Sequence, residues 1–164
     1  MGIMNVRIDE RLVHGIVATY WLPSLKADRV ICIDEESAAS PMMKSALRMA
    51  TPSHIYLSVI SLEKAVHNFK TGKYGNEKIM VIAKTPKPLR DLYEAGIVFP
   101  SITMGNLGII RKEEGSVPVT KYLNVTAEHK ELFEQFHRDG VELVNQLIPD
   151  DAPADFYTLM SSKF

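Results

Sequence analysis

The sequence predicts an α/β fold: a single open, mostly parallel sheet with helices on both faces and an antiparallel or irregular edge strand. Two observations support this fold class. Short apolar runs, typical of buried parallel strands, alternate with stretches of helical periodicity along most of the 164 residues. No linker, repeat or low-complexity segment interrupts this alternation, so residues 1–164 are expected to form one domain.

The expected strands are short and rich in β-branched residues. Parallel strands that are covered on both faces should be apolar along their whole length, as the runs RVICID and KIMVIA nearly are. Pro118 cannot donate a hydrogen bond to a ladder, so residues 117–123 are expected at an edge or as an irregular strand. The other strands are expected at residues 5–8, 29–34, 54–60, 78–83, 101–104 and 141–148.

The helices between these strands are marked by start and stop residues. Ser40 followed by Pro41 predicts the start of a helix, and Gly140 predicts the end of a helix that Thr126 caps. Pro23 is expected to stop the first helix. The expected helices cover residues 16–22, 40–49, 61–72, 88–95 and 126–140, with a short one after Pro153.

Helical periodicity also assigns side chains to the core or to solvent. On the charged helix after Thr126, His129 and His137 are expected to face solvent. Cys32, the single cysteine, lies inside an apolar run and is expected to be a buried thiol in a reducing compartment. The inward face of the helix after Ser40 is expected to consist of Met42, Met43, Ala46, Leu47 and Ala50.

The composition limits the possible classes of function. The net charge is -1, whereas a nucleic-acid-binding protein usually carries a strong basic excess. Charged residues within positions 7–11 argue against the apolar core of a signal peptide, and no uncharged apolar stretch is long enough to span a bilayer. The protein is therefore expected to be cytoplasmic, without direct membrane insertion, and any membrane function would require a partner.

The strongest chemical signal is the segment RIDERLVHG at residues 7–15. His14 should lie at the carboxyl end of the first strand and near the start of the first helix, where α/β sheets bind ligands and helix N–H groups favour anions. Imidazole is a nucleophile near neutral pH and could accept a phosphoryl group covalently. Arg7 and Arg11 supply forked donors for phosphate, and Gly15 allows close backbone approach. Taken alone, such a histidine is as often a cap or a surface contact.

Other polar residues should reach the same edge of the sheet, because crossover connections align the carboxyl ends of parallel strands. Asp34 follows the second strand, Lys84 the fourth and Gly105 the fifth. The loop at Gly105 could donate backbone hydrogen bonds to an anion, or it could be a plain turn. These three residues are therefore candidates for supporting a group bound at His14.

Several other chemistries lack their motifs. The five histidines lie on different expected elements, and neither HExxH nor CxxC occurs, so a metal site is not expected. The turn after the first strand lacks the paired glycines of a dinucleotide site. The chain contains neither a P-loop nor the GxSxG elbow of a hydrolase, and no cofactor is expected.

The segment RIDERLVHG, followed by Val17, Ala18, Thr19 and Trp21, resembles the phosphorylation-site signature of the EIIB subunits of the mannose/fructose/sorbose family of the sugar phosphotransferase system. The similarity extends over nearly the whole chain. One departure is Ile16, which stands where the family usually has glutamine after the His-Gly pair. The supporting matches are Asp34-Glu35, Lys84-Thr85-Pro86, the TMGN segment at 103–106, and GVEL at 140–143 with Pro149.

This resemblance implies a phosphotransferase of the protein-Nπ-phosphohistidine–sugar type, associated with the membrane only through its partners. His14 would take a phosphoryl group from a phosphohistidine on an EIIA protein and deliver it to a sugar that enters through the membrane subunits EIIC and EIID. Arg11 and Arg7 would neutralise the phosphoryl charge, and Asp9 would orient these arginines rather than act as a base. Neither a metal nor a cofactor takes part in such a transfer.

Two alternatives remain open at this point. Ile16 is consistent with a regulatory relative that binds EIIA without transferring phosphate, and a hydrolase or mutase could also use a transient phosphohistidine. The sequence does not identify the sugar, although the RIDERL and TMGN segments are somewhat closer to the N-acetylgalactosamine branch of the family.

Overall fold

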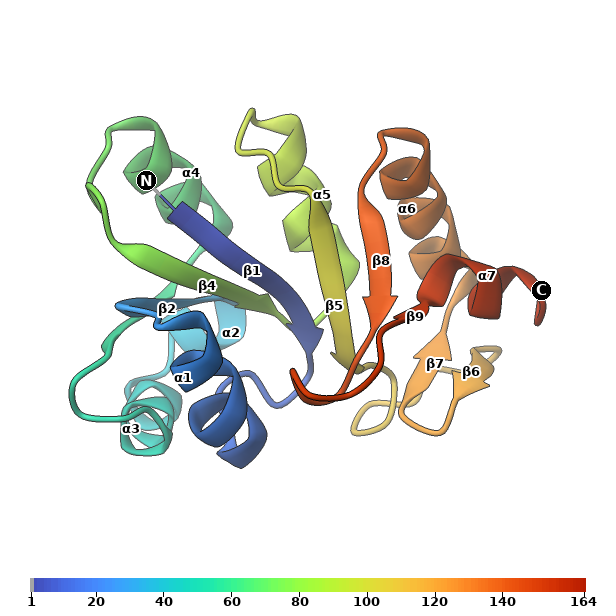
Figure 1. Cartoon of the computed structure of the whole chain (residues 1–164), viewed down its shortest axis with the longest axis horizontal. Coiled ribbons are helices and arrows are strands. Elements are labelled where there is room, and N and C mark those ends of the chain that lie inside the picture. Colours follow the sequence, from blue (N-terminus) through green and yellow to red (C-terminus); the bar gives the residue numbers. More distant parts are fainter. Residues whose placement is uncertain (1) are drawn as a thin grey trace.

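The computed structural model describes residues 2–164 and confirms the expected fold class (Figure 1). One seven-stranded sheet has the order β3-β2-β4-β1-β5-β8-β9, and only its last pair, β8 and β9, is antiparallel. A separate antiparallel pair, β6 and β7, lies beside it. The strands are β1 (Gly2–Asp9), β2 (Arg29–Ile33), β3 (Tyr56–Ile60), β4 (Lys78–Ala83), β5 (Ser101–Asn106), β6 (Val117–Thr120), β7 (Leu123–Val125), β8 (Glu142–Asn145) and β9 (Ala154–Asp155).

Helices cover both faces of the large sheet. In Figure 1, α4, α5 and α6 lie side by side over one face, and η1, α1 and α3 lie over the other. No helix within residues 2–164 is long and apolar enough to cross a membrane. The helices are η1 (Val17–Trp21), α1 (Leu22–Leu25), α2 (Glu35–Ala38), α3 (Pro41–Ala50), α4 (Leu62–Lys70), α5 (Pro86–Glu94), α6 (Ala127–Arg138) and α7 (Phe156–Ser161).

The central strands separate two hydrophobic cores. Successive side chains of a strand point to opposite faces, so Val30 and Cys32 of β2 enter one core while Ile31 and Ile33 enter the other. Both sets are buried, which explains why these strands are apolar throughout. Cys32 is buried, as expected, and burial raises the pKa of its thiol to about 12.

The first helix differs from its expected form, because Pro23 does not stop it. Helical backbone runs from residue 15 to residue 25, and its middle is the π-helical turn η1, where the N–H of Leu22 donates to the carbonyl of Val17. The π turn shifts the hydrogen-bond register just before Pro23, which stands in the first turn of α1. The helix ends instead at Lys26, whose backbone is left-handed with φ 50°.

Two expectations about side-chain exposure were wrong. Of the expected inward face of α3, only Leu47 is buried; Met42 is 81% exposed and Ala46 is also exposed. The helix packs along a narrow line through Leu47, so apolar residues farther round it remain in solvent. His129 on α6 is half-buried rather than solvated, because it faces the segment that precedes β6, whereas His137 is exposed as expected.

The strands at the edges of the fold also differ in detail from the expected ones. Residues 117–123 form a hairpin rather than one strand, with Pro118 exposed on β6. The antiparallel edge of the large sheet is β9, a two-residue strand where only a helix was expected. Strand β5 continues to Asn106 because Asn106 pairs with Asp9 of β1, so Gly105 lies in a strand and not in a bend.

Candidate functional site

Four side chains, Arg7, Asp9, Arg11 and His14, meet at the carboxyl end of β1, and we call them the histidine cluster. Strand β1 lies between β4 and β5, near the middle of the sheet, so its end is the ligand-binding edge of this fold. His14 stands immediately before the helical segment, and its carbonyl accepts the first helical hydrogen bond, from the N–H of Ala18 at 2.9 Å. The sheet and the helix thus fix the histidine from both sides.

Asp9 is the centre of the cluster and is fully buried. Its Oδ2 lies 3.0 Å from Nε2 of His14, and its Oδ1 accepts from Nε of Arg11 at 3.1 Å. Nε of Arg7 lies 3.5 Å from Oδ2. Burial alone would raise the pKa of Asp9, but the hydrogen bonds from His14 and Arg11 and the neighbouring positive charges hold it below its usual value. Asp9 is therefore a carboxylate, which orients its neighbours and is a poor base near neutral pH.

The hydrogen bond to Asp9 decides which nitrogen of His14 can react. A carboxylate only accepts hydrogen bonds, so Nε2 of the imidazole carries the proton that it donates to Asp9. In the neutral ring the lone pair then belongs to Nδ1. The His14 side chain is 16% exposed, so this ring is held in place but remains reachable from solvent.

The two arginines have different surroundings. The Arg11 side chain is 34% exposed and shares the Asp9 carboxylate with His14, its Nε binding Oδ1 while Nε2 of His14 binds Oδ2. Arg7 is completely buried: Nη1 donates to the carbonyl of Gln146 at 3.0 Å, Nη2 donates to the carbonyl of Leu147 at 3.2 Å, and the guanidinium lies 4.9 Å from the centre of the Trp21 ring. Burial lowers the pKa of Arg7 to about 10, so it is still charged at neutral pH.

Gly105 lies against the cluster from the neighbouring strand β5. A Cβ at this position would stand 2.5 Å from Nη2 of Arg7 and 2.5 Å from Oδ2 of Asp9. Any side chain would therefore displace the buried ion pair. The structure places Gly105 as a close packing contact of the cluster, and its neighbour Gly108, with φ +70°, forms the turn that follows.

Asp34 and Lys84 lie at the same edge but form a separate pair. Nζ of Lys84 is 3.1 Å from Oδ2 of Asp34, and the same carboxylate caps α2 by accepting the N–H of Ser37 at 3.1 Å. Burial opposes ionisation of Asp34, but Ser37 and Lys84 outweigh it and lower its pKa. In the described part of the chain, no hydrogen bond or ion pair joins this pair to the histidine cluster.

Several residues that build the cluster were not among the site residues expected from the sequence. The carbonyls of Gln146 and Leu147 hold Arg7 from 139 and 140 residues away. Trp21 donates to the Leu147 carbonyl at 2.8 Å and thereby holds that loop against the helix. Leu12 adopts φ 57°, which is unusual for a residue with a side chain, and its buried side chain anchors the tight turn between Asp9 and His14.

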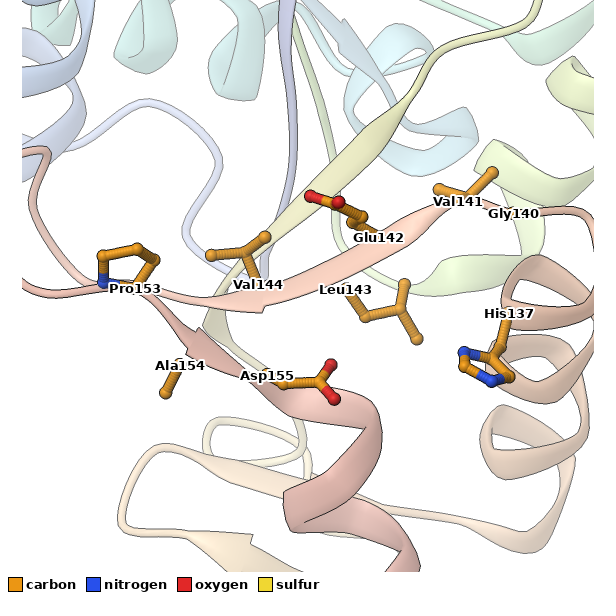
Figure 2. Close-up of a pocket in the computed structure, with 9 residues that line it drawn as sticks. All are labelled: His137, Gly140, Val141, Glu142, Leu143, Val144, Pro153, Ala154 and Asp155. Carbon is orange, nitrogen blue, oxygen red and sulfur yellow. The ribbon is translucent and has the colours of Figure 1, made fainter.

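A larger hollow lies elsewhere in the molecule. A cavity of about 480 Å³ lies along β8 and β9, near the end of α6, and Figure 2 shows that its lining includes His137, Glu142 and Asp155. None of its lining residues belongs to the histidine cluster. This hollow is therefore not part of the candidate phosphoryl site.

The comparison with known proteins agrees with the geometry. The model of the family "PTS system sorbose subfamily IIB component" matches residues 3–164. The chain belongs to this family. It is 30% identical over 160 residues to the fructose-specific EIIB component of Bacillus subtilis (strain 168), covering 98% of this chain and 96% of that protein.

Two further relatives of this EIIB chain are informative. It is 27% identical over 161 residues to the mannose-specific EIIAB component of Escherichia coli (strain K12). This match covers 98% of this chain and 49% of the longer relative. The crystal structure of the IIBSor domain of the sorbose permease from Klebsiella pneumoniae superposes with a TM-score of 0.91 at 24% identity, over 99% of this chain and 98% of that one. The family resemblance drawn from residues 7–15 is thus confirmed.

The lowered pKa of Asp9 predicts how stability depends on pH. A carboxyl group whose pKa is lower in the folded state stabilises the fold above its unfolded pKa, near 3.8, and this contribution is lost as the pH falls through the folded pKa. Asp9→Asn should therefore cost roughly 3 kcal/mol at pH 7, because it leaves the buried Arg7 charge without its partner. The difference from wild type should shrink towards pH 3.

Urea unfolding of both proteins between pH 7 and pH 3 measures this difference. Asp150→Asn, at an exposed position, is the matched control and should change stability by less than about 0.5 kcal/mol throughout. A deficit of Asp9→Asn that stays constant down to pH 3 would contradict the assigned charge state.

Proposed function

We propose that this EIIB chain is a phosphocarrier in which Nδ1 of His14 accepts a phosphoryl group from a phosphohistidine of an EIIA protein and passes it to a sugar at the membrane subunits EIIC and EIID. The observation that carries the proposal is the 3.0 Å contact between Nε2 of His14 and Asp9, which leaves the other ring nitrogen, Nδ1, as the nucleophile, while Nε of Arg11 binds the other oxygen of the same carboxylate. The protein would work in the cytoplasm, at the membrane only through these partners.

The histidine cluster supplies the groups that this chain contributes to the chemistry. In the first step the Nδ1 lone pair of His14 attacks phosphorus, a P–N bond forms, and the P–N bond of the donor breaks with its electron pair returning to the donor imidazole. In the second step a sugar hydroxyl attacks the same phosphorus, the electron pair returns to Nδ1, and the hydroxyl proton passes to water or to a base of the membrane subunit. Such transfers depend mainly on positioning and on neutralising charge.

The three charged neighbours of His14 have distinct roles in this scheme. Arg11 is the arginine that reaches solvent and shares the Asp9 carboxylate with His14, so it neutralises the phosphoryl oxygens. Asp9 keeps the Nε2 proton in place and stabilises the positive charge that the ring gains on phosphorylation. Arg7 acts as a positioning residue, since its donors are directed to backbone carbonyls and to Asp9.

The names of the relatives support the proposed partner proteins but do not identify the sugar. The Escherichia coli relative is named an EIIAB component, so in that protein an EIIA unit and an EIIB unit share one chain. The names of the three reported relatives refer to fructose, mannose and sorbose. The sugar of this chain is left unassigned, and the likeness to the N-acetylgalactosamine branch stays a prediction.

The regulatory alternative depends on Ile16. This side chain is partly buried and packs against the core that contains Leu12, Val17 and Trp21. Isoleucine therefore continues the hydrophobic core at the start of the helix, and this packing explains the residue without a loss of phosphotransfer. A regulator would bind EIIA without taking up phosphate, and a hydrolase or mutase would turn over a soluble phosphoester.

Phosphate uptake tests the proposed function directly. Incubation with phosphoenolpyruvate, the general phosphotransferase proteins and the cognate EIIA should add one acid-labile phosphate to the wild-type chain. His14→Ala should take up none, because it lacks the nucleophile. His137→Gln, which changes an exposed histidine of α6, is the matched control and should be labelled normally. Labelling of His14→Ala would contradict the assignment of His14 as the phosphorylated residue. If the wild-type chain binds EIIA but is not labelled, the regulatory alternative is favoured.

The surroundings of the arginines predict different kinetic effects. Arg11→Ala should slow phosphoryl transfer roughly 100-fold, as the loss of one charged donor to a transition state typically does. Arg7→Ala should mainly lower stability, and the fraction that stays folded should transfer faster than Arg11→Ala. Rapid-quench measurement of transfer from phosphorylated EIIA gives both rates. Arg138→Ala, at an exposed position of α6, serves as the control, and equal rates for the two cluster variants would contradict the assigned roles.

A further inference from the structure

A second cavity, of about 240 Å³, lies beside the histidine cluster and is not used by the proposed phosphotransfer. It is bounded by residues that follow β4 and β5, by the segment that precedes β6, and by the first turn of α6. Its volume corresponds to roughly eight water molecules at about 30 Å³ each, and it is below the roughly 300–1,000 Å³ of sites for drug-sized ligands. Its size suits one small molecule.

Three of the four charged side chains that line this cavity already have partners, whereas the fourth, Glu113, is exposed and has none among residues 2–164. Lys84 pairs with Asp34 at 3.1 Å, and Arg111 pairs with Glu36 at 3.0 Å. The carboxylate of Glu10 accepts the backbone N–H groups of residues 109 and 110, each at 3.0 Å. An anionic ligand would have to compete with carboxylates for both cations, so these groups do not favour a phosphate or an acid.

Two polar atoms in the lining are buried and uncommitted. Oγ of Ser116 and Nδ1 of His129 have no hydrogen-bond partner among residues 2–164. Buried polar atoms are almost always paired, so both atoms call for a partner. Neither atom has accessible surface, so a ligand in the cavity supplies this partner only when the two side chains turn towards it. Burial lowers the pKa of His129, against the opposing charges of Glu113, Glu128 and Glu10, so its ring is neutral near pH 7 and offers one donor and one acceptor.

The remaining wall is apolar. Leu107 is buried at the base of the cavity, and Ile110, which also lines it, is 62% exposed. The cavity therefore combines hydroxyl and neutral imidazole groups with a hydrocarbon surface. Three of its four charged side chains are paired within the protein, and the fourth, Glu113, is a carboxylate, which accepts hydrogen bonds. Sugars and polyols have the matching character, because their hydroxyls both donate and accept hydrogen bonds and their C–H groups pack on apolar side chains.

We infer that this cavity binds a neutral polyhydroxylated molecule the size of a single sugar ring, with hydroxyls on Ser116 and His129 and C–H groups against Leu107 and Ile110. The cavity is adjacent to the histidine cluster, because Glu10 lines the cavity and directly follows Asp9 in the sequence. The Glu10 carboxylate also accepts hydrogen bonds from the backbone N–H groups of residues 109 and 110. A bound polyol would order this loop beside the histidine cluster. The inference does not depend on phosphotransfer by His14.

Titration with neutral polyols tests the site. The probes are D-mannose, D-fructose, D-glucose and D-mannitol, with inorganic phosphate as the anionic comparison. At least one polyol should shift the ring ¹⁵N resonances of His129 saturably, with a dissociation constant in the millimolar range or tighter. The same shift should persist in His14→Ala, which separates this site from the phosphoryl site.

Two variants test the contacts. His129→Phe keeps a ring of similar shape without nitrogen, and Ser116→Ala removes only a hydroxyl, so one is informative if the other does not fold. Each folded variant should bind the polyol at least tenfold more weakly by calorimetry, whereas His137→Phe on the exposed side of α6 should bind as wild type does. The inference is overturned if no polyol binds saturably, if only phosphate binds, or if both variants bind normally.

Discussion

The buried carboxylate of Asp9 is the interaction on which the rest of the site depends. A charge without solvent must be paired and hydrogen-bonded, and here Arg7, Arg11 and His14 supply that pairing together. Each of these partners is thereby fixed in place. The carboxylate also selects the imidazole nitrogen that carries a proton, so the element that stabilises the site is the one that prepares its chemistry.

The fold supplies the conditions for this carboxylate. Strand β1 lies between β4 and β5, so its last residues are covered on both sides, and Gly105 lets β5 pack directly on the ion pair. Behind the pair, Trp21 and the carbonyls of residues 146 and 147 enclose Arg7. In front, the tight turn through Leu12 returns His14 to Asp9 at the start of the helix. The His14 side chain consequently keeps 16% of its surface exposed while Asp9 holds its Nε2.

Local patterns predicted the parts of this arrangement that depend on neighbours in sequence. The strand end and the place of His14 before a helix follow from spacing within residues 7–15, whereas the pairing of Asp9 with Arg11 was expected from the family resemblance. The enclosure of Arg7 could not be predicted from local spacing, because its partners are backbone carbonyls about 140 residues away, which any residue type can provide. Periodicity also misplaced Met42 and His129, since it gives the direction of a side chain but not which neighbouring segment covers that direction.

The position of the phosphate on His14 tests the central claim most directly. The protein labelled with ¹⁵N in its histidines would be phosphorylated through EIIA, and the coupling between ³¹P and the ring nitrogens would be measured by NMR. The Asp9 hydrogen bond to Nε2 predicts that the phosphorus is bonded to Nδ1, with the proton retained on Nε2. A phosphate bonded to Nε2 would contradict the account, because that nitrogen is the one that Asp9 holds.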